Sequence, residues 1–239
     1  MNKLILLMAM ILCTACTQQP QQTDIAEDVE AQLNIAQLSE ENGQLSAALT
    51  IYQRVYNKWP GDEVNLALGR LYYQQKEWLK AQLHLNQIPE QSELREQGNL
   101  WQAKTQLRLM KPEQALAFMP ETPNTSEWLN LKGVALDYQQ RHIEAQALYQ
   151  QGLQHKPMSV RLRKNLVYSY LLAGKYQQAE SELNTLFELG YRNKNYDALN
   201  AMVILLQGDD EEAKRTLERY STPLEIDQFA AQLEQLRKP

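Results

Sequence analysis

The 239-residue sequence contains only two cysteines, Cys13 and Cys16, and both lie within its first twenty residues. The rest of the chain can therefore form neither an internal disulfide nor a cysteine-ligated zinc site. Glycine and proline are also scarce, at nine residues each, which is typical of a helical protein that uses them to mark turns. The formal net charge of -5 gives no electrostatic reason to expect a nucleic-acid partner.

Sequence motifs for chemistry are scarce as well. The three histidines, His84, His142 and His155, are far apart in the sequence, and none has a partner at the spacing of a metal site. The HExxH metal motif and the glycine-rich phosphate loops do not occur. We therefore expect structural or solvent-exposed roles for the histidines and no enzymatic activity. We also expect no catalytic residue, no metal, no small-molecule substrate and no cofactor apart from a covalent lipid.

What the sequence does have is an alanine that recurs at steps of 33, 34, 30, 34 and 34 residues. The six positions are Ala48, Ala81, Ala115, Ala145, Ala179 and Ala213. This is the period of the tetratricopeptide repeat, in which a small residue of the second helix lets two helices cross closely. A small or apolar residue recurs twelve residues before each alanine, and a large apolar residue four residues after it. The pattern predicts an all-α fold: a tetratricopeptide-repeat solenoid of about six helical hairpins plus a C-terminal capping helix.

The composition predicts how the chain is divided. We expect a lipoprotein signal peptide over 1–15, lipidated Cys16 with a flexible tether over 16–23, repeats one to three over 24–119, a proline-containing break over 120–126, repeats four to six over 127–220, and the capping helix over 221–239. The break contains Pro120 and Pro123 and coincides with the one short alanine step. Any subdivision of the repeat array is therefore expected at this break.

The first residues favour export and lipidation. An apolar run over 4–12 follows Lys3, and it is too short for a membrane-spanning helix, which needs about 20 residues. It has the length of a signal-peptide core. The small residues Thr14 and Ala15 directly precede Cys16, and this segment resembles the processing site of bacterial lipoproteins. We therefore expect Cys16 to carry acyl chains that hold the protein on a membrane.

The residue after the expected lipidated cysteine predicts the membrane in which the protein is retained. In the lipoprotein sorting rule an aspartate at this position favours retention in the inner membrane, and here the residue is Thr17. The resemblance therefore implies the periplasmic face of the outer membrane of a Gram-negative cell. The polar stretch over 17–22 is typical of a flexible tether.

The expected binding surface is the concave face, built from positions two, five, nine, twelve and thirteen of each first helix. The candidate groove residues are Asn130, Val134, Asp137, Tyr138, Arg161, Lys164, Asn165, Tyr168, Leu171, Leu172 and Met202. A mixed groove of apolar and tyrosine side chains would hold a helix or an extended segment. Arg161, Lys164 and Asn165 also partly resemble a clamp for a peptide's terminal carboxylate. Alternatively, Tyr168, Leu171 and Leu172 merely pack against a neighbouring helix.

One charged surface has a simpler interpretation. The first expected helix carries six acids without an intervening lysine or arginine: Asp24, Glu27, Asp28, Glu30, Glu40 and Glu41. We interpret them as a solvated face, with the acids near the helix start favoured by the helix dipole.

The second half of the chain carries a family likeness. The segments concerned are 133–137, 141–149, Asn165-Leu166, 174–176, 205–209, Glu212-Ala213 and the Pro223-bearing terminal helix. Together with the cysteine-containing start, they resemble the TadD-like lipoproteins of the tight-adherence (Tad, Flp pilus) secretion system. The resemblance implies a non-enzymatic assembly factor whose partner is an outer-membrane secretin or another pilus-assembly component. Two alternatives remain open: a type IV pilus pilotin, and an envelope adaptor that docks peptidoglycan enzymes or proteases.

Overall fold

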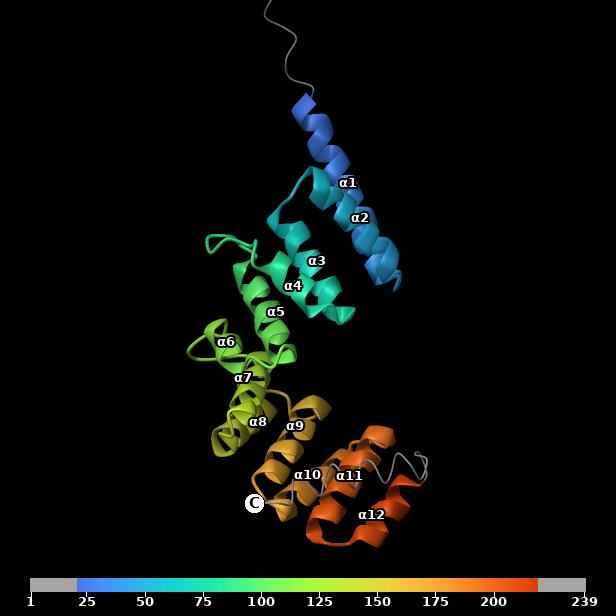
Figure 1. The fold of residues 1–239 in the computed structure, drawn as a ribbon, viewed down its shortest axis with the longest axis vertical. Coiled ribbons are helices and arrows are strands. Elements are labelled where there is room, and N and C mark those ends of the chain that lie inside the picture. The colour runs from blue at the N-terminus through green and yellow to red at the C-terminus, as the bar shows by residue number, and fades with distance from the viewer. Residues whose placement is uncertain (1–20, 219–239) are drawn as a thin grey trace, which may run out of the picture. The chain divides into compact units, whose positions relative to one another are not determined.

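The computed structural model describes residues 21–218, which form two compact units (Figure 1). The first unit extends to Gly98 and the second begins at Asn99. The described residues form twelve helices and no strand, so the predicted all-α tetratricopeptide-repeat fold is confirmed. The expected signal peptide, lipidated Cys16 and C-terminal capping helix lie outside the described residues.

The first unit contains two helical hairpins. Helix α1 (Gln21–Glu41) packs on α2 (Leu45–Lys58), α2 packs on α3 (Asp62–Gln74), and α3 packs on α4 (Trp78–Leu85). Helix α1 already includes residues 21–23, which the sequence assigns to the tether, so the helix begins earlier than predicted. Helix α5 (Arg95–Arg108) begins in this unit and continues into the second.

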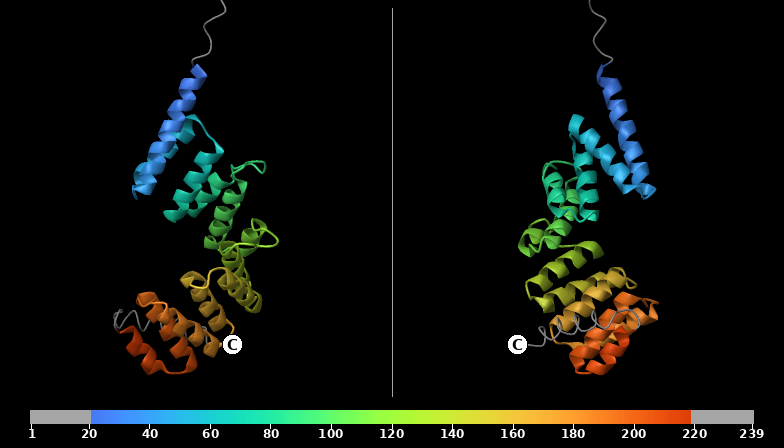
Figure 2. Two further views of the ribbon diagram at one scale, coloured as in Figure 1. Left: turned by 180° about the vertical axis from the view of Figure 1, so that it is seen from behind. Right: turned by 45° about the vertical axis from the view of Figure 1, so that its right-hand side comes forward.

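The second unit continues the repeats from α6 onward. Its helices are α6 (Pro112–Ala117), α7 (Ser126–Tyr138), α8 (His142–His155), α9 (Val160–Leu172), α10 (Tyr176–Glu188), α11 (Lys194–Gln207) and α12 (Asp210–Leu217). Each helix from α6 to α12 packs on the next, and the ribbon passes back and forth between them (Figure 2). Helix α9 also contacts both α7 and α11 directly. The three first helices of the last repeats therefore form one continuous layer.

The recurring alanines lie where helices cross most closely. All six are 0–3% exposed. In two repeats the residue twelve positions earlier is a glycine, and a larger residue would not fit there for the same reason. A Cβ atom added to Gly133 would lie 2.5 Å from Cε1 of Tyr149, and one added to Gly69 would lie 2.5 Å from Cγ of Leu85. These glycines allow a large side chain of the second helix to pack directly on the backbone of the first.

Each hairpin turns through the same backbone motif. The residue five positions before each recurring alanine has a positive φ angle: Gly43, Lys76, Met110, Gln140, Gly174 and Gly208. At Gly174 its N–H donates to the Leu171 carbonyl at 3.0 Å, and the Lys175 N–H donates to the Tyr170 carbonyl at 2.8 Å. This pair of hydrogen bonds is the Schellman motif that ends a helix in a left-handed residue. Glycine occupies this position in only three of the six turns.

The proline-containing break is not the boundary between the units, which corrects the predicted subdivision. One apolar cluster continues through it, because Ala103 of α5 and Ala115 of α6 are buried together with Trp128 of α7. Lys104 also forms an ion pair with Glu127 at 2.7 Å. The chain divides earlier, at Gly98, after a connection between Leu85 and Arg95 that contains no α-helix. The prolines interrupt the backbone helix, but they do not interrupt the packing around it.

Candidate functional site

Equivalent positions of α7, α9 and α11 form an apolar edge along the inner face of the second unit. Residues one repeat apart occupy position nine (Val134, Tyr168 and Met202) and position thirteen (Tyr138, Leu172 and Leu206). Three of these side chains are large and strongly exposed: Tyr138 at 46%, Tyr168 at 40% and Leu172 at 52%. The other three, Val134, Met202 and Leu206, are half-buried and pack against the core. The apolar edge therefore remains open to a partner.

Positions two and five of the same helices form a polar edge. Arg161 is exposed, and the half-buried Lys164 places its Nζ 5.5 Å from the ring centre of Tyr191. Burial acts to raise the pKa of Glu127, but the hydrogen bond from Lys104 and the charges of Lys104 and Arg161 outweigh burial, and the pKa lies below its usual value. The inner face thus has apolar side chains at one edge and, at the other, polar ones that include two cations, Arg161 and Lys164.

The asparagines expected at the groove contact each other. The Asn165 amide donates to Asn130 Oδ1 at 2.8 Å, which links α9 to α7. Asn130 is buried, so it supports the face from beneath and is not part of its surface. The amide of Asn165 is engaged in the same contact, so a carboxylate clamp would have Arg161 and Lys164 as its free cationic members.

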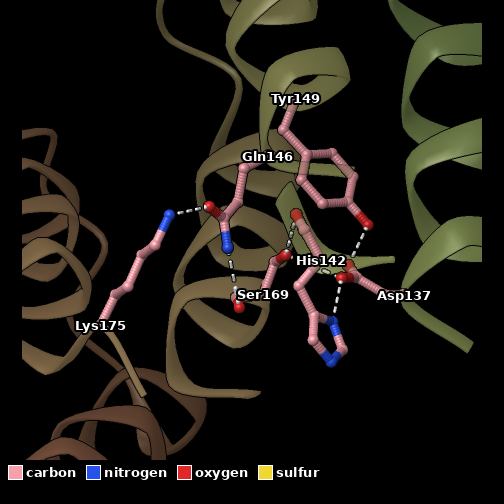
Figure 3. Close-up of polar contacts among 6 residues, drawn as sticks. All are labelled: Asp137, His142, Gln146, Tyr149, Ser169 and Lys175. Carbon is pink, nitrogen blue, oxygen red and sulfur yellow. Dashed lines mark hydrogen bonds and ion pairs between the residues drawn. The ribbon is translucent and has the colours of Figure 1, made fainter. Parts of the chain in front are cut away.

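Asp137 differs most from its predicted role, because its carboxylate is occupied within the protein (Figure 3). Tyr149 Oη donates to Asp137 Oδ2 at 2.8 Å, and Ser169 Oγ donates to Asp137 Oδ1 at 2.7 Å. The His142 ring nitrogen Nδ1 lies 2.9 Å from Oδ1. Three helices thus converge on one carboxylate. Burial, and then the negative charge of Asp137, raise the pKa of Tyr149 and keep its hydroxyl protonated as a donor.

The polar network continues to the next hairpin. Gln146 Nε2 donates to the Ser169 carbonyl at 3.1 Å, and Lys175 Nζ donates to Gln146 Oε1 at 2.9 Å. Ser169 Oγ also lies 3.3 Å from the His142 carbonyl oxygen, an acceptor within the same group (Figure 3). The network joins α7, α8 and α9 to the residue that precedes α10. It fixes the geometry of the inner face from behind.

Serine, histidine and aspartate meet in this network, but not in the order of a catalytic triad. In a triad the serine donates to the histidine, and the histidine donates to the aspartate. Here Ser169 donates directly to Asp137, and Ser169 is 0% exposed, so its hydroxyl has no access to a substrate. The arrangement is suited to holding helices together.

The inner face therefore contains most, but not all, of the predicted groove residues. Those that lie on it are Val134, Tyr138, Arg161, Lys164, Asn165, Tyr168, Leu172 and Met202. Asn130 and Asp137 form internal hydrogen bonds, and Leu171 belongs to the buried core. Position twelve turns toward the core or the second helix of its own hairpin, and Asn130 at position five is buried, so these three side chains are not on the surface of the face.

The predicted groove missed a second concave region, which lies wholly within the first unit. It is a hollow of about 660 Å³ between α1, α3 and the residues just before and within the start of α5. Its side chains include Gln37 and Glu41 of α1 and Glu63, Leu66 and Arg70 of α3. Most of these lining residues are at the same repeat positions as the residues of the inner face of the second unit. This equivalence is the sequence signal from which they could have been predicted.

Two further observations concern the described residues alone. No helix between residues 21 and 218 is both long and apolar enough to cross a bilayer. In the same part of the chain, no three His, Cys, Asp or Glu side chains are grouped so that they could hold a metal ion. The predicted absence of enzymatic activity and of a metal stays a prediction.

Comparison with known proteins agrees with the helical-repeat architecture. Sequence profiles of the tetratricopeptide repeat match residues 138–203 and residues 30–62. An uncharacterized protein of Sinorhizobium fredii, y4yS, is 38% identical over 72 residues, which are 28% of this chain and 40% of that protein. The chain therefore matches well under half of the length of this relative.

Solved structures resemble a larger part of the chain. PilW, described as a widely conserved type IV pilus biogenesis factor, has a TM-score of 0.71 at 17% identity, over 82% of this chain and 96% of PilW. A tetratricopeptide repeat protein from Parabacteroides merdae has a TM-score of 0.68 at 14% identity, over 86% of this chain and 84% of its own. PilF of Pseudomonas aeruginosa has a TM-score of 0.65 at 14% identity, over 87% of this chain and 99% of its own. By its repeats and its helices, the chain has the all-α fold of a tetratricopeptide-repeat solenoid.

Proposed function

We propose that the chain is a non-enzymatic assembly factor that binds a protein partner on the inner face of its second unit. The observation that carries this proposal is the apolar edge of Tyr138, Tyr168 and Leu172, large side chains that remain exposed on one layer of helices. Exposed apolar groups gathered on one face, with polar groups beside them, are typical of protein-interaction sites. Tyrosine and arginine are also the residues most enriched where binding energy concentrates.

The inner face suits one kind of occupant best. Its apolar edge follows positions nine and thirteen, and its cationic edge contains Arg161 and Lys164. A segment lying across α7, α9 and α11 would place apolar side chains on the first edge and acidic side chains on the second. An amphipathic helix or extended strand can meet both edges at once. A polar network behind the face holds α7 and α9 in register, so less order is lost on binding.

The proposed process is the assembly of an adhesive pilus. The structural likeness to PilW supports a role in pilus biogenesis. The likeness of residues 133–149 and 205–213 to Tad lipoproteins favours the Flp pilus and its outer-membrane secretin as the partner. Because PilW serves type IV pili, a type IV pilus pilotin is the second candidate.

The proposed location follows from Cys16. A lipid on this residue would tether the repeats to the periplasmic face of the outer membrane, where a secretin subunit arrives before it assembles. Tethering converts the encounter into a nearly intramolecular one, which raises the effective concentration of the partner. A face of modest affinity is then sufficient.

A deletion strain tests the proposal when it is complemented with two matched double variants. Tyr138→Ser with Leu172→Ser removes exposed apolar groups from the inner face. Ile143→Ser with Met158→Ser removes apolar groups that are even more exposed, at 68% and 78%, and that belong to α8 and to the turn after it. We expect that the first variant does not restore secretin multimers and surface pili. We expect that the second variant restores both.

Three outcomes of this experiment decide between the candidates. Normal secretin multimers and pili in the deletion strain would contradict the assembly role itself. Loss of type IV pili with intact Flp pili would select the pilotin function. Equal failure of both double variants, with both proteins folded, would show that the inner face is not the contact surface.

A further inference from the structure

The hollow of the first unit has a chemistry that the proposed function does not use. Four glutamates and one arginine line it, which gives it three net negative charges. The arginine is already neutralised, because Arg70 Nη2 lies 2.8 Å and 2.7 Å from the two carboxylate oxygens of Glu40. The remaining glutamates, Glu41, Glu63 and Glu93, form no ion pair with any residue of the described range 21–218.

The three unpaired glutamates belong to different elements that surround one space. Glu41 ends α1, Glu63 lies in the first turn of α3, and Glu93 precedes α5. Burial, then the hydrogen bond and charge of Glu40, with a smaller contribution from Glu63, raise the pKa of Tyr52, which also lines the hollow. The three unpaired carboxylates around one space give the hollow a negative potential.

The size and spacing of the acids exclude a simple metal ion as the match. A volume of about 660 Å³ lies in the range of sites that enclose a small molecule or a few residues of peptide. No three acidic, histidine or cysteine side chains of the described residues are grouped tightly enough to hold one cation. Charges distributed around a space of this size suit a ligand with several separated cationic groups.

The apolar surface of the hollow indicates that the ligand is more than a polycation. Leu66 and Ala67 of α3 and the half-buried Leu94 line the same space as the glutamates. A peptide with alternating basic and apolar side chains can pair its cations with the acids and bury its apolar groups. The net charge of -5 makes a different protein a better occupant than a second copy of this chain.

We propose that this hollow is a second recognition site, which binds a lysine- or arginine-bearing segment of a partner protein. Two of the six acids of the first helix, Glu40 and Glu41, then have a specific use, because they line the site and are not part of a merely solvated surface. This proposal goes beyond the assembly role and does not depend on it. The two inner faces would select segments of opposite charge.

Fluorescence anisotropy of the full chain, purified in a neutral detergent, tests the proposal. The probe is a labelled ten-residue peptide of alternating lysine and leucine, with a glutamate–leucine and a lysine–serine peptide for comparison. The triple variant Glu41→Gln, Glu63→Gln and Glu93→Gln removes the unpaired charges. The control variant Glu27→Gln, Asp28→Asn and Glu96→Gln removes three exposed acids of the same unit that lie outside the hollow.

We expect the lysine–leucine peptide to bind best, and binding to weaken as salt screens the charges. The triple variant should raise its dissociation constant about tenfold, since each exposed ion pair contributes modestly, while the control should change it less than about twofold. Equal weakening in both variants would mean general attraction to an acidic surface, and it would overturn the proposal. No weakening in the triple variant, or a preference for the glutamate peptide, would overturn it as well. Tyr138→Ser with Leu172→Ser should leave this binding unchanged, which separates the site from the inner face of the second unit.

Discussion

Tyr149 Oη of α8 donates a hydrogen bond to Asp137 Oδ2 of α7, with the two oxygens 2.8 Å apart. The same tyrosine ring packs on the backbone of Gly133, one turn earlier in α7. One side chain therefore closes the hairpin through both its apolar ring and its polar hydroxyl. This contact positions Tyr138 and Val134, which belong to the inner face of the same helix.

Removing the carboxylate at the centre of the network should destabilise the second unit strongly. Asp137→Ala leaves the Tyr149 hydroxyl without its acceptor and leaves the Ser169 hydroxyl only the longer contact with the His142 carbonyl, and we expect a loss of about 3 kcal/mol in the free energy of unfolding. Tyr149→Phe keeps the ring and removes one hydrogen bond, so it should cost about 1 kcal/mol. Urea denaturation measures both. In the Asp137→Ala background the tyrosine substitution should cost almost nothing, and full additivity would contradict the network.

A methyl group at the closest helix crossing should also be costly. In Gly133→Ala the new Cβ would lie 2.5 Å from a ring that is itself fixed by Asp137, and we expect a net loss of about 1–2 kcal/mol despite the better helix propensity of alanine. Gly152→Ala is the matched control, because its nearest neighbours would be the ends of the Leu162 side chain, at 3.0 Å and 3.1 Å, and Leu129 Cβ lies at an ordinary contact distance of 3.7 Å. Its effect on thermal stability should be small. Equal losses of thermal stability in the two variants would refute the explanation that the close helix crossing requires a glycine at position 133.

The left-handed turn residues offer a stabilising change. Gln140 has a φ angle of 62° at the position where Gly174 has 69° in the next hairpin. Since only glycine adopts this conformation without strain, Gln140→Gly should stabilise the protein by about 0.5–1 kcal/mol. The reverse change, Gly174→Gln, should destabilise it by a similar amount. Midpoints of thermal unfolding that move in the same direction for both variants would contradict the argument.

The stability of the first unit should fall on the acid side of neutrality because of His84. Burial lowers the pKa of this side chain below the usual 6.5, where its Nδ1 lies 3.1 Å from Asn65 Oδ1 and its ring contacts Tyr56 and Tyr72. The unfolded chain then binds the proton more readily than the folded one. The contribution of His84 is complete above about pH 6.5 and is lost as the pH falls toward the lowered folded pKa.

A variant at the same position isolates this contribution. His84→Gln keeps a hydrogen-bonding group beside Asn65 but does not titrate. Denaturation midpoints at about pH 7.5 and about pH 5 should differ less in the variant than in the original protein. The same pH dependence in both would assign the effect to other groups.

The fold could be predicted from the sequence because its determinants are local and periodic. A small residue that recurs every 34 residues has few structural uses, and the burial of Ala145 and Ala179 follows directly from it. The turns follow too, since Gly174 and Gly208 appear at the same offset from those alanines. The turn at Lys76 gives no such signal, because a lysine and not a glycine has the positive φ angle there.

The site could be predicted only in outline. Helical periodicity places Tyr138, Tyr168 and Leu172 on the inner face, and their exposure agrees with that. The same periodicity places Asp137 there, but its carboxylate is engaged by Tyr149 and Ser169 of two other helices. Contacts between residues 12 and 32 positions apart leave no local pattern in the sequence. The division of the chain at Gly98 could not be predicted from the sequence for a related reason. Prolines at 120 and 123 signal a local interruption of the backbone, whereas the division into two units depends on how packing contacts are distributed along the chain.

The central claim is that the inner face of the second unit contacts a protein partner, and site-specific photo-crosslinking in intact cell envelopes tests it most directly. A photoreactive amino acid at position 168, on the apolar edge, should give one discrete crosslinked product that contains a pilus-assembly protein. The same amino acid at position 143 of α8, where the native side chain is more exposed than that of Tyr168, should give none. Crosslinks from position 143 but not from position 168, or no discrete product from either, would contradict the account.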